Sequence, residues 1–253
     1  MGEAFLALAP WQVALYGVAW FSTLYFGFGA LNWWLTRGLL PRLGYGRQLD
    51  PRPLPPGQVR REIGESVVSI LIFGVGLLAP WALLRLGWAH LAHDPSPARI
   101  ALETVALFFW NELHFYVNHR LLHTQALRRF HGRHHRSHIA TPFSTYALHP
   151  VEAMMLGSVS MLPMLLHDFS FQALAALTVV SIALNSLGHS NYEFSAHAPA
   201  RGWLGASRRH HLHHACYHGN YGFLLETFDR WAGSVLPGDA AGARATTNRT
   251  PSA

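Results

Sequence analysis

The chain has 253 residues, of which 50% are hydrophobic and only 13% are charged. That charged fraction is about half the usual share for a soluble globular domain. The single cysteine, Cys216, excludes an internal disulfide framework and a cysteine-rich metal site. All 19 basic residues are arginines, grouped in short stretches between apolar runs. This pattern favours a membrane protein and argues against a nucleic-acid-binding one.

The first apolar segments predict membrane helices. Residues 4–36 contain no charged side chain, which exceeds the ~20 residues needed to cross a bilayer, and a helix is expected at about 11–35. The N-terminus lacks a basic region and an A-x-A cleavage pattern, so we expect this helix to be retained and not removed as a signal peptide. An arginine- and proline-rich loop follows, because proline at such density cannot continue a helix. Further helices are expected at about 66–84 and 100–123.

Residues 151–190 predict two more apolar helices, separated by the polar stretch "HDFS". The first of these is short, so a tilted or re-entrant hairpin is an alternative to a full crossing. The sequence therefore predicts an all-α integral membrane protein with about four to five membrane helices. We divide it into an N-terminal membrane helix and loop (1–64), a domain that contains the remaining apolar helices (65–236) and a disordered tail (237–253).

The arginines also predict the orientation. Arginine-rich stretches occur at 37–61, 120–136 and 201–209, whereas the intervening loops 1–10, 89–98 and 167–170 contain none. Positively charged loops remain on the cytoplasmic side of a membrane. An odd number of crossings precedes each histidine-rich stretch, which places those stretches on the same cytoplasmic face.

Three histidine boxes recur at regular spacing. The motif "HRLLH" spaces two histidines four residues apart, and "HGRHH" and "HHLHH" share the spacing H-x-x-H-H; a further histidine ends the last apolar helix in "LGHSNYE". Residues at i, i+3 and i+4 share one side of a helix, and imidazole is the commonest transition-metal ligand in proteins. The predicted ligands are His119, His123, His131, His134, His135, His189, His210, His213 and His214.

Nine imidazoles exceed the four ligands of a structural zinc site and are enough for two metals. A diiron centre is the natural hypothesis, because iron activates O₂ and zinc does not. No catalytic side chain is predicted beyond the metal ligands. Four residues are further candidates, as additional ligands or as supports of the ligands: His149, Glu193, Glu112 and Tyr116.

The motifs "NELHFYVNHRLLH", "HGRHH", "TPFSTYALHPVE", "LGHSNYEF" and "HHLHH…NYGFLLETFDRWAG" together resemble the sterol desaturase/fatty acid hydroxylase superfamily over roughly residues 65–235. The resemblance implies a membrane-bound oxygenase with a histidine-ligated pair of irons, and it carries the ligand role to the same nine histidines. Glu193 stands where some hydroxylases have another histidine. Glu112 stands where an aspartate often precedes the first box.

The resemblance further implies hydroxylation or desaturation of a lipid drawn from the bilayer, using O₂ and a separate ferredoxin- or cytochrome b5-like electron donor. The expected location is the bacterial inner membrane, with the metal site on the cytoplasmic face. The alternative is a histidine-rich membrane metal transporter, which would carry polar ligands near the bilayer midplane. The sequence does not decide the substrate, the choice between hydroxylation and desaturation, the electron donor, the oligomeric state or the ligands of each metal.

Overall fold

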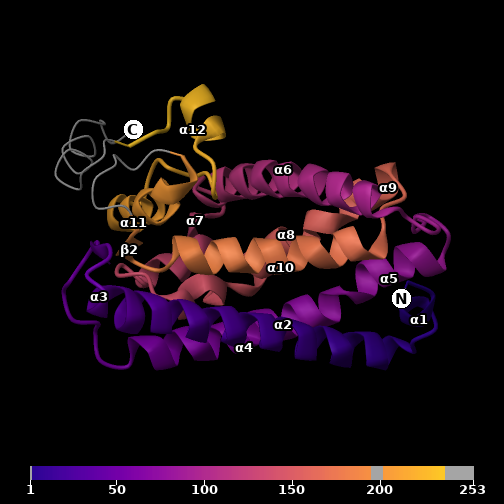
Figure 1. Cartoon of the computed structure of the whole chain (residues 1–253), viewed down its shortest axis with the longest axis horizontal. Coiled ribbons are helices and arrows are strands. Elements are labelled where there is room, and N and C mark those ends of the chain that lie inside the picture. The colour runs from indigo at the N-terminus through magenta and orange to yellow at the C-terminus, as the bar shows by residue number, and fades with distance from the viewer. Residues whose placement is uncertain (1, 195–201, 237–253) are drawn as a thin grey trace.

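The computed structural model describes residues 2–194 and 202–236 and shows an elongated bundle of antiparallel helices (Figure 1). The predicted tail, 237–253, lies outside the described residues. The α-helices are α1 (Gly2–Leu6), α2 (Pro10–Trp34), α3 (Leu40–Arg42), α4 (Gln58–Gly76), α5 (Leu78–Arg85), α6 (Pro97–Leu122), α7 (Arg128–His131), α8 (Pro150–Gly157), α9 (Met161–Leu166), α10 (Phe171–Gly188), α11 (Ala206–Cys216) and α12 (Thr227–Trp231). Short 3₁₀ or π-helical turns lie at Leu35–Leu39, His134–Arg136, Pro142–Tyr146, Ser158–Ser160 and Trp203–Gly205. The two short strands β1 (Arg47–Gln48) and β2 (Tyr192–Glu193) pair antiparallel.

The chain passes along the bundle repeatedly, and every histidine box lies at the same end. In Figure 1, α2 runs from the α1 end to the α3 end, α4 and α5 return, and α6 runs forward to α7. The shorter α8 and α9 lead back, and α10 ends beside α11 and β2. This antiparallel order brings segments far apart in the sequence to one end of the bundle.

Within the described part of the chain, three helical stretches are long and apolar enough to cross a membrane, namely Pro10–Arg42, Gln58–Arg85 and Phe171–Gly188. The all-α membrane fold is thus confirmed. The predicted count of four to five membrane helices also requires α6 and the stretch Pro150–Leu166. Neither is both long enough and apolar enough to count as a membrane span by length and composition. Pro150–Leu166 is too short, and α6 carries several charged residues.

An apolar stripe nevertheless runs the whole length of α6. Its members recur every three or four residues, so they share one face of the helix. They are between 38% and 72% exposed, and a row of large exposed apolar side chains of this kind suits contact with lipid. The stripe consists of Leu102, Val105, Phe109, Leu113, Val117 and Leu121.

The contact between α2 and α4 depends on two glycines. A Cβ atom at Gly17 would lie 2.6 Å from the carbonyl oxygen of Gly74, and one at Gly74 would lie 2.4 Å from Val18. Small residues let helix backbones approach closely, as is common where helices pack inside membranes. The close pair holds the N-terminal helix against the rest of the bundle.

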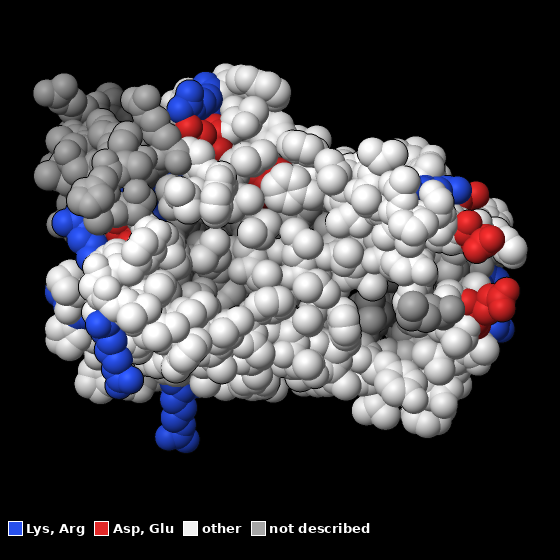
Figure 2. Space-filling view, in the orientation of Figure 1, with Lys and Arg blue, Asp and Glu red and all other residues white. Residues whose placement is uncertain are grey.

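Charge is unevenly distributed between the ends of the bundle. Figure 2 shows arginine at the end that contains α3 and α11, and acidic side chains with few basic ones at the opposite end. Arg85 and Arg99 belong to that opposite end, since they lie at the end of α5 and in the first turn of α6. Among the described residues, the predicted concentration of arginine on the histidine-bearing face therefore holds, with these two arginines as exceptions.

Candidate metal centre

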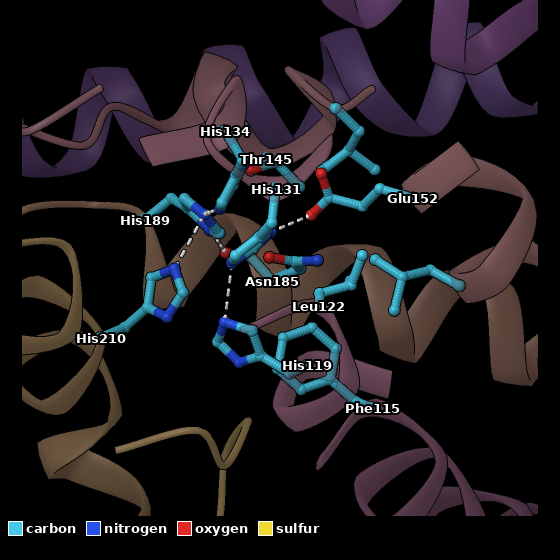
Figure 3. Close-up of a pocket in the computed structure, with 12 residues that line it drawn as sticks. Phe115, His119, Leu122, His131, His134, Thr145, Glu152, Asn185, His189 and His210 are labelled. Carbon is cyan, nitrogen blue, oxygen red and sulfur yellow. Dashed lines mark hydrogen bonds and ion pairs between the residues drawn. The ribbon is translucent and has the colours of Figure 1, made fainter. Parts of the chain in front are cut away.

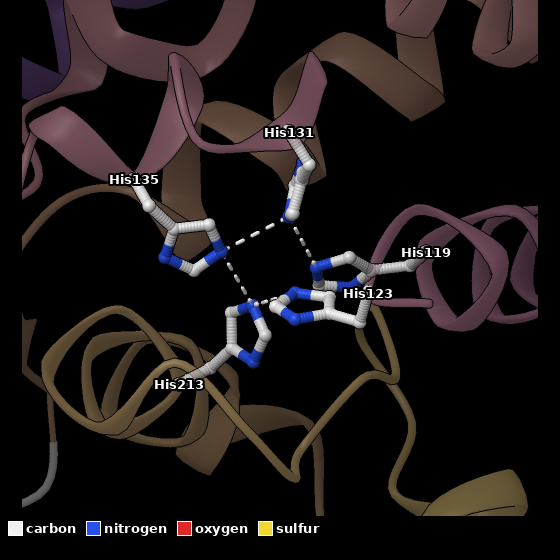
Figure 4. Close-up of side chains that lie close together, drawn as sticks. All are labelled: His119, His123, His131, His135 and His213. Carbon is white, nitrogen blue, oxygen red and sulfur yellow. Dashed lines mark hydrogen bonds between the residues drawn. The ribbon is translucent and has the colours of Figure 1, made fainter. Parts of the chain in front are cut away.

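Two groups of histidines converge at one end of the bundle, and within each group the nearest ligand atoms all lie within 4.8 Å of one another. The five-histidine cluster consists of His119, His123, His131, His135 and His213 (Figure 4). The four-histidine cluster consists of His134, His189, His210 and His214. The structure thus brings together all nine histidines named from the sequence, whose role as ligands remains a proposal.

Each H-x-x-H-H box divides between the two clusters. In the first box, residues i and i+4, His131 and His135, join the five-histidine cluster, while the i+3 residue His134 joins the other. In the second box this is reversed, because His210 and His214 join the four-histidine cluster and His213 the five-histidine one. Residues at i+3 and i+4 lie about 100° apart around a helix axis, so one box can face two neighbouring sites.

The position of the proton on several imidazole rings can be inferred from the groups that surround the Nδ1 atom. The Nδ1 atom of His119 lies 2.9 Å from the carbonyl oxygen of Tyr221, and Nδ1 of His213 lies 2.7 Å from that of Gly219. In the other cluster, Nδ1 of His189 lies 2.8 Å from the carbonyl oxygen of Asn185. A carbonyl oxygen can only accept a hydrogen bond, so these Nδ1 atoms carry the proton and the Nε2 atoms present lone pairs.

Nε2 atoms of different histidines then face one another inside each cluster, and for His119 and His131, whose Nδ1 atoms both lie beside an acceptor, both Nε2 atoms present lone pairs. Nε2 of His131 lies 3.1 Å from Nε2 of His119 and 3.0 Å from Nε2 of His135. Nε2 of His189 lies 3.1 Å from Nε2 of His134 and 2.9 Å from Nε2 of His210 (Figure 3). The contact between the lone pairs of His119 and His131 is repulsive unless a cation lies between the two nitrogens. The residues therefore fit a metal ion in each cluster.

The spacing between these nitrogens also fits binding to a shared ion. Two nitrogens bound about 2.1 Å from one ion lie about 3.0 Å apart at a right angle and about 3.4 Å apart at a tetrahedral angle. The adjacent Nε2 pairs are 2.9–3.2 Å apart in both clusters. The donor atoms of each cluster are therefore close enough to bind one shared ion.

Burial keeps these imidazoles in the form that binds metal. Desolvation lowers the pKa of His134 and His135, and of His210, His213 and His214 on α11, well below the usual value, and neighbouring histidines lower it further. Only a neutral imidazole has a lone pair for a metal. The folded chain therefore presents these ligands deprotonated at neutral pH.

A small cavity of about 10 Å³ touches both clusters (Figure 3). His119 and His131 of one cluster and His189 of the other line it. On the side of the helices it is bounded by apolar side chains, among them Phe115 and Leu156. The cavity has room for about one water molecule. It marks the place where both clusters meet the apolar interior of the bundle.

Glu152, near the start of α8, was not singled out in the sequence. Its Oε1 lies 2.7 Å from Nδ1 of His131, and both side chains are almost fully buried (Figure 3). Its Oε2 forms no hydrogen bond within the described residues. A carboxylate on the second nitrogen of a metal-binding histidine fixes the ring and raises its basicity. The signal that could have found Glu152 is an acidic residue directly before an apolar stretch, in "HPVEAMMLG".

Two of the four further candidates, Glu112 and Tyr116, lie on α6 and contact groups other than the histidines of the two clusters. The carboxylate of Glu112 accepts hydrogen bonds from the backbone N–H groups of Leu224 and Leu225, the shortest at 2.8 Å. The hydroxyl of Tyr116 accepts a hydrogen bond of 3.1 Å from Arg120. Neither belongs to a histidine cluster. Glu112 instead ties the C-terminal segment to α6.

The other two candidates also lie outside the clusters. Nδ1 of His149 accepts a hydrogen bond of 3.2 Å from the N–H of Val151 and so caps α8, and the ring lies 4.7 Å from that of Phe130. Glu193 is buried in an ion pair with Arg208. His149 thus positions the helix that carries Glu152.

The motif "NYG…D" shapes the segment that supplies the carbonyl groups. Asp229 is buried and accepts hydrogen bonds of 2.8 Å and 2.6 Å from the N–H groups of Tyr221 and Gly222, and one of 2.6 Å from Ser234. Burial raises the pKa of this carboxyl, against the effect of those donors. Asn220 is anchored to α11 by a hydrogen bond of 3.2 Å to the carbonyl oxygen of Arg209. The loop is therefore held where its carbonyls meet the histidines.

The family profile described as "Fatty acid hydroxylase" matches residues 104–234, slightly more than half of the chain. The chain belongs to the fatty acid hydroxylase family. The matched region contains all nine histidines of the two clusters. Curated relatives named as sterol desaturases and lathosterol oxidases further support the resemblance to the sterol desaturase/fatty acid hydroxylase superfamily.

Three of these relatives illustrate the similarity. The Delta(7)-sterol 5(6)-desaturase of Eremothecium gossypii is 28% identical over 192 residues, which cover 72% of this chain and 52% of the relative. The Delta(7)-sterol 5(6)-desaturase erg3B of Aspergillus fumigatus is 30% identical over 186 residues, which cover 70% of this chain and 53% of the relative. The human lathosterol oxidase is 25% identical over 186 residues, which cover 70% of this chain and 61% of the relative. The chain thus spans about half the length of the fungal relatives, and no solved structure matches it significantly.

Proposed function

We propose that this member of the fatty acid hydroxylase family is a membrane-bound oxygenase that holds two iron ions and hydroxylates or desaturates a lipid. The observation that carries the proposal is the pair of all-histidine clusters facing one small cavity at the end of an apolar bundle. The nine histidines are the proposed ligands. Residues 65–236 are the proposed catalytic domain.

Iron is proposed because of the chemistry and geometry of the donor set. Imidazole suits iron as well as zinc, but nine imidazoles in two clusters exceed the four ligands of a structural zinc site. When bound, a pair of redox-active irons supplies the reduction of O₂ that attack on an unactivated C–H bond requires. Hydroxylation consumes the lipid, O₂, two electrons and two protons and yields an alcohol and one water; desaturation yields an alkene and two waters.

The chain's own residues have three tasks in this reaction. Backbone carbonyls and Glu152 hold the protons on Nδ1, so that the Nε2 atoms remain available to the metals. The apolar wall with Phe115, Leu122 and Leu156 receives the reacting carbon and excludes bulk water. The lipid-facing helices allow a substrate to reach this wall without leaving the bilayer. Substrate orientation against the cavity decides between hydroxylation and desaturation.

The remaining parts of the proposal concern substrate, partners and location. Sterols are the first lipids to test, because the relatives are named for sterol desaturation. Electrons are supplied by a separate ferredoxin- or cytochrome b5-like carrier. The arginine-rich end faces the cytoplasm of a bacterial inner membrane, following the distribution of positive charge. A metal transporter would carry its ligands near the bilayer midplane, whereas both clusters lie at one end of the bundle (Figure 1).

The test is lipid turnover by purified protein in bilayers containing a sterol, supplied with iron, a reduced carrier protein and isotopically labelled O₂. We expect a product that has gained one labelled oxygen atom or lost two hydrogen atoms, detected by mass spectrometry, and no product from a His213→Ala variant. A broader panel of fatty acyl and other membrane lipids extends the test. Absence of O₂ uptake with every lipid, together with zinc movement across vesicles, would contradict the proposal and favour the transporter.

A further inference from the structure

Two tyrosines cover the five-histidine cluster on its solvent side. The ring of Tyr217 lies 4.3 Å from that of His135 and 5.0 Å from that of His123, and the ring of Tyr221 lies 5.1 Å from that of His123. Tyr217 is 38% exposed, whereas His135 is 3% exposed. Tyr217 is therefore an exposed side chain in direct ring contact with two histidines of this cluster.

Tyr217 holds this position in an unusual backbone conformation. It follows the last residue of α11 with a φ of 61°, in the left-handed region. Glycine normally takes that place at the end of a helix, and a bulky residue there is strained. Strain that a structure retains often accompanies a functional role. The hydroxyl of Tyr217 also donates a hydrogen bond of 3.3 Å to the carbonyl oxygen of Arg128, which joins the ring to α7.

The surface next to Tyr217 is rich in arginine, and among the described arginines of 120–136 only Arg136 pairs with a carboxylate, that of Glu65. Residues 120–136 contain five arginines and no acidic residue. Arg128 and Arg129 are exposed and form no ion pair within the described residues. By contrast, Arg52, Arg208 and Arg230 at the same end are paired with acidic residues. The unpaired arginines of α7 are thus available to an external anion.

We propose that Tyr217 and the arginines of α7 form the docking surface for an acidic one-electron carrier protein, with Tyr217 as the contact nearest the five-histidine cluster. The inference rests on the proposed function, which requires electrons from outside the chain. In each encounter the carrier is oxidised by one electron and the centre is reduced by one. Two encounters supply the two electrons of a turnover.

A protein carrier fits this surface better than a lipid headgroup does. The lipid-facing stripe of α6 ends at Leu121, and α7 begins beyond the end of that helix. Opposite charges on two surfaces steer diffusional encounter and set its salt dependence, which suits the brief complexes of electron carriers. Electron transfer also slows steeply with distance, so a partner gains from meeting the exposed ring that contacts the ligands.

The first experiment measures binding of two acidic probes, a [2Fe–2S] ferredoxin and the soluble haem domain of cytochrome b5, to the purified full chain at low salt. In the variant Arg128→Glu/Arg129→Glu we expect affinity for the carrier to fall about tenfold or more, since two attractions become repulsions. The control variant Arg42→Glu/Arg47→Glu changes the net charge equally, at exposed positions on α3 and β1. We expect it to retain affinity within about threefold.

Three binding results would overturn the docking surface. The first is wild-type protein that binds neither probe. The second is an equal loss of carrier affinity in the Arg128→Glu/Arg129→Glu and Arg42→Glu/Arg47→Glu variants. The third is an Arg128→Glu/Arg129→Glu variant that loses only its binding to anionic phospholipid vesicles. The last would assign the arginines of α7 to lipid headgroups. Added salt should weaken carrier binding, because exposed charges are screened, and an affinity that is insensitive to salt would also count against the proposal.

A second experiment separates docking from electron entry. Under anaerobic conditions, Tyr217→Leu should slow reduction of the centre by the carrier while leaving carrier affinity, metal content and reduction by dithionite near wild type. Tyr217→Phe, which keeps the ring, should retain most of the rate. Equal rates for Tyr217→Leu and wild type would overturn the role of the ring. Absence of any metal reducible by dithionite in the wild type would instead contradict the proposed oxygenase.

Discussion

Replacement of Glu152 by glutamine tests the contact that the sequence did not reveal. Oε1 of Glu152 lies 2.7 Å from Nδ1 of His131, in a site where both side chains are 3% exposed or less. The Glu152→Gln change keeps the shape of the side chain and removes its negative charge. Since Nε2 of His131 adjoins those of His119 and His135, the effect should fall on the five-histidine cluster.

The expected magnitude follows from the chemistry of the contact. Hydrogen bonds to an ionised group are roughly twice as strong as neutral ones, and losing such a partner of a metal-bound histidine typically lowers metal affinity about 10–100-fold. That range corresponds to about 1.4–2.7 kcal/mol. We expect one of the two metals to be bound more weakly by this factor.

The assay is competition between the protein and a calibrated chelator, with bound metal counted by elemental analysis. Glu103→Gln is the matched control, because Glu103 is also a buried carboxylate that contacts a histidine, His167, but lies at the opposite end of the bundle. We expect Glu103→Gln to leave metal affinity unchanged even if it lowers stability. Equal metal affinity in Glu152→Gln and wild type would refute the reasoning.

Three further predictions concern the ligands, pH and the helix contact. His134→Ala and His213→Ala each remove one ligand from a different cluster, so each should lower the metal content by about one ion per chain and abolish turnover; full metal content in either variant would contradict the ligand assignment. Burial holds the pKa of the histidines on α11 and in the turn 134–136 below the unfolded value of about 6.5, so the unfolded chain binds more protons. Chelator-treated protein should therefore lose thermal stability as the pH falls from about 8 to about 5.5, and an unchanged Tm would refute this. Gly17→Ala should destabilise the protein by about 1–3 kcal/mol, because its methyl group would meet the backbone of Gly74, whereas Gly27→Ala on the same helix has open space; comparing their Tm values checks this.

Much of the fold followed from apolar length and proline-rich interruptions. The number of membrane crossings did not follow from the sequence, because α6 carries charged residues, α8 and α9 are short, and helix length and composition do not reveal which face meets lipid. The stripe from Leu102 to Leu121 becomes visible only when the exposed face of α6 is known. The local sequence pattern thus predicted the helices, whereas tertiary packing determined which face of each helix is exposed.

The candidate site divides in the same way. The spacing H-x-x-H-H predicted which histidines would gather, since it depends on neighbours in the chain. It did not predict that His134 and His213 would each join the cluster opposite to that of the other two histidines in its box. That division depends on how α11 packs against the turn 134–136. The contacts of Glu152 and of the Tyr221 carbonyl join segments 21 and 102 residues apart in the chain. Only the tertiary fold brings such groups together.

The measurement that tests the central claim most directly is the metal content of the purified chain, combined with Mössbauer spectroscopy after growth on ⁵⁷Fe. The two clusters predict two irons per chain in nitrogen-rich sites, both lost when the chelator removes metal. A single ion per chain, or zinc retained in tetrahedral coordination after supply of iron, would contradict the account.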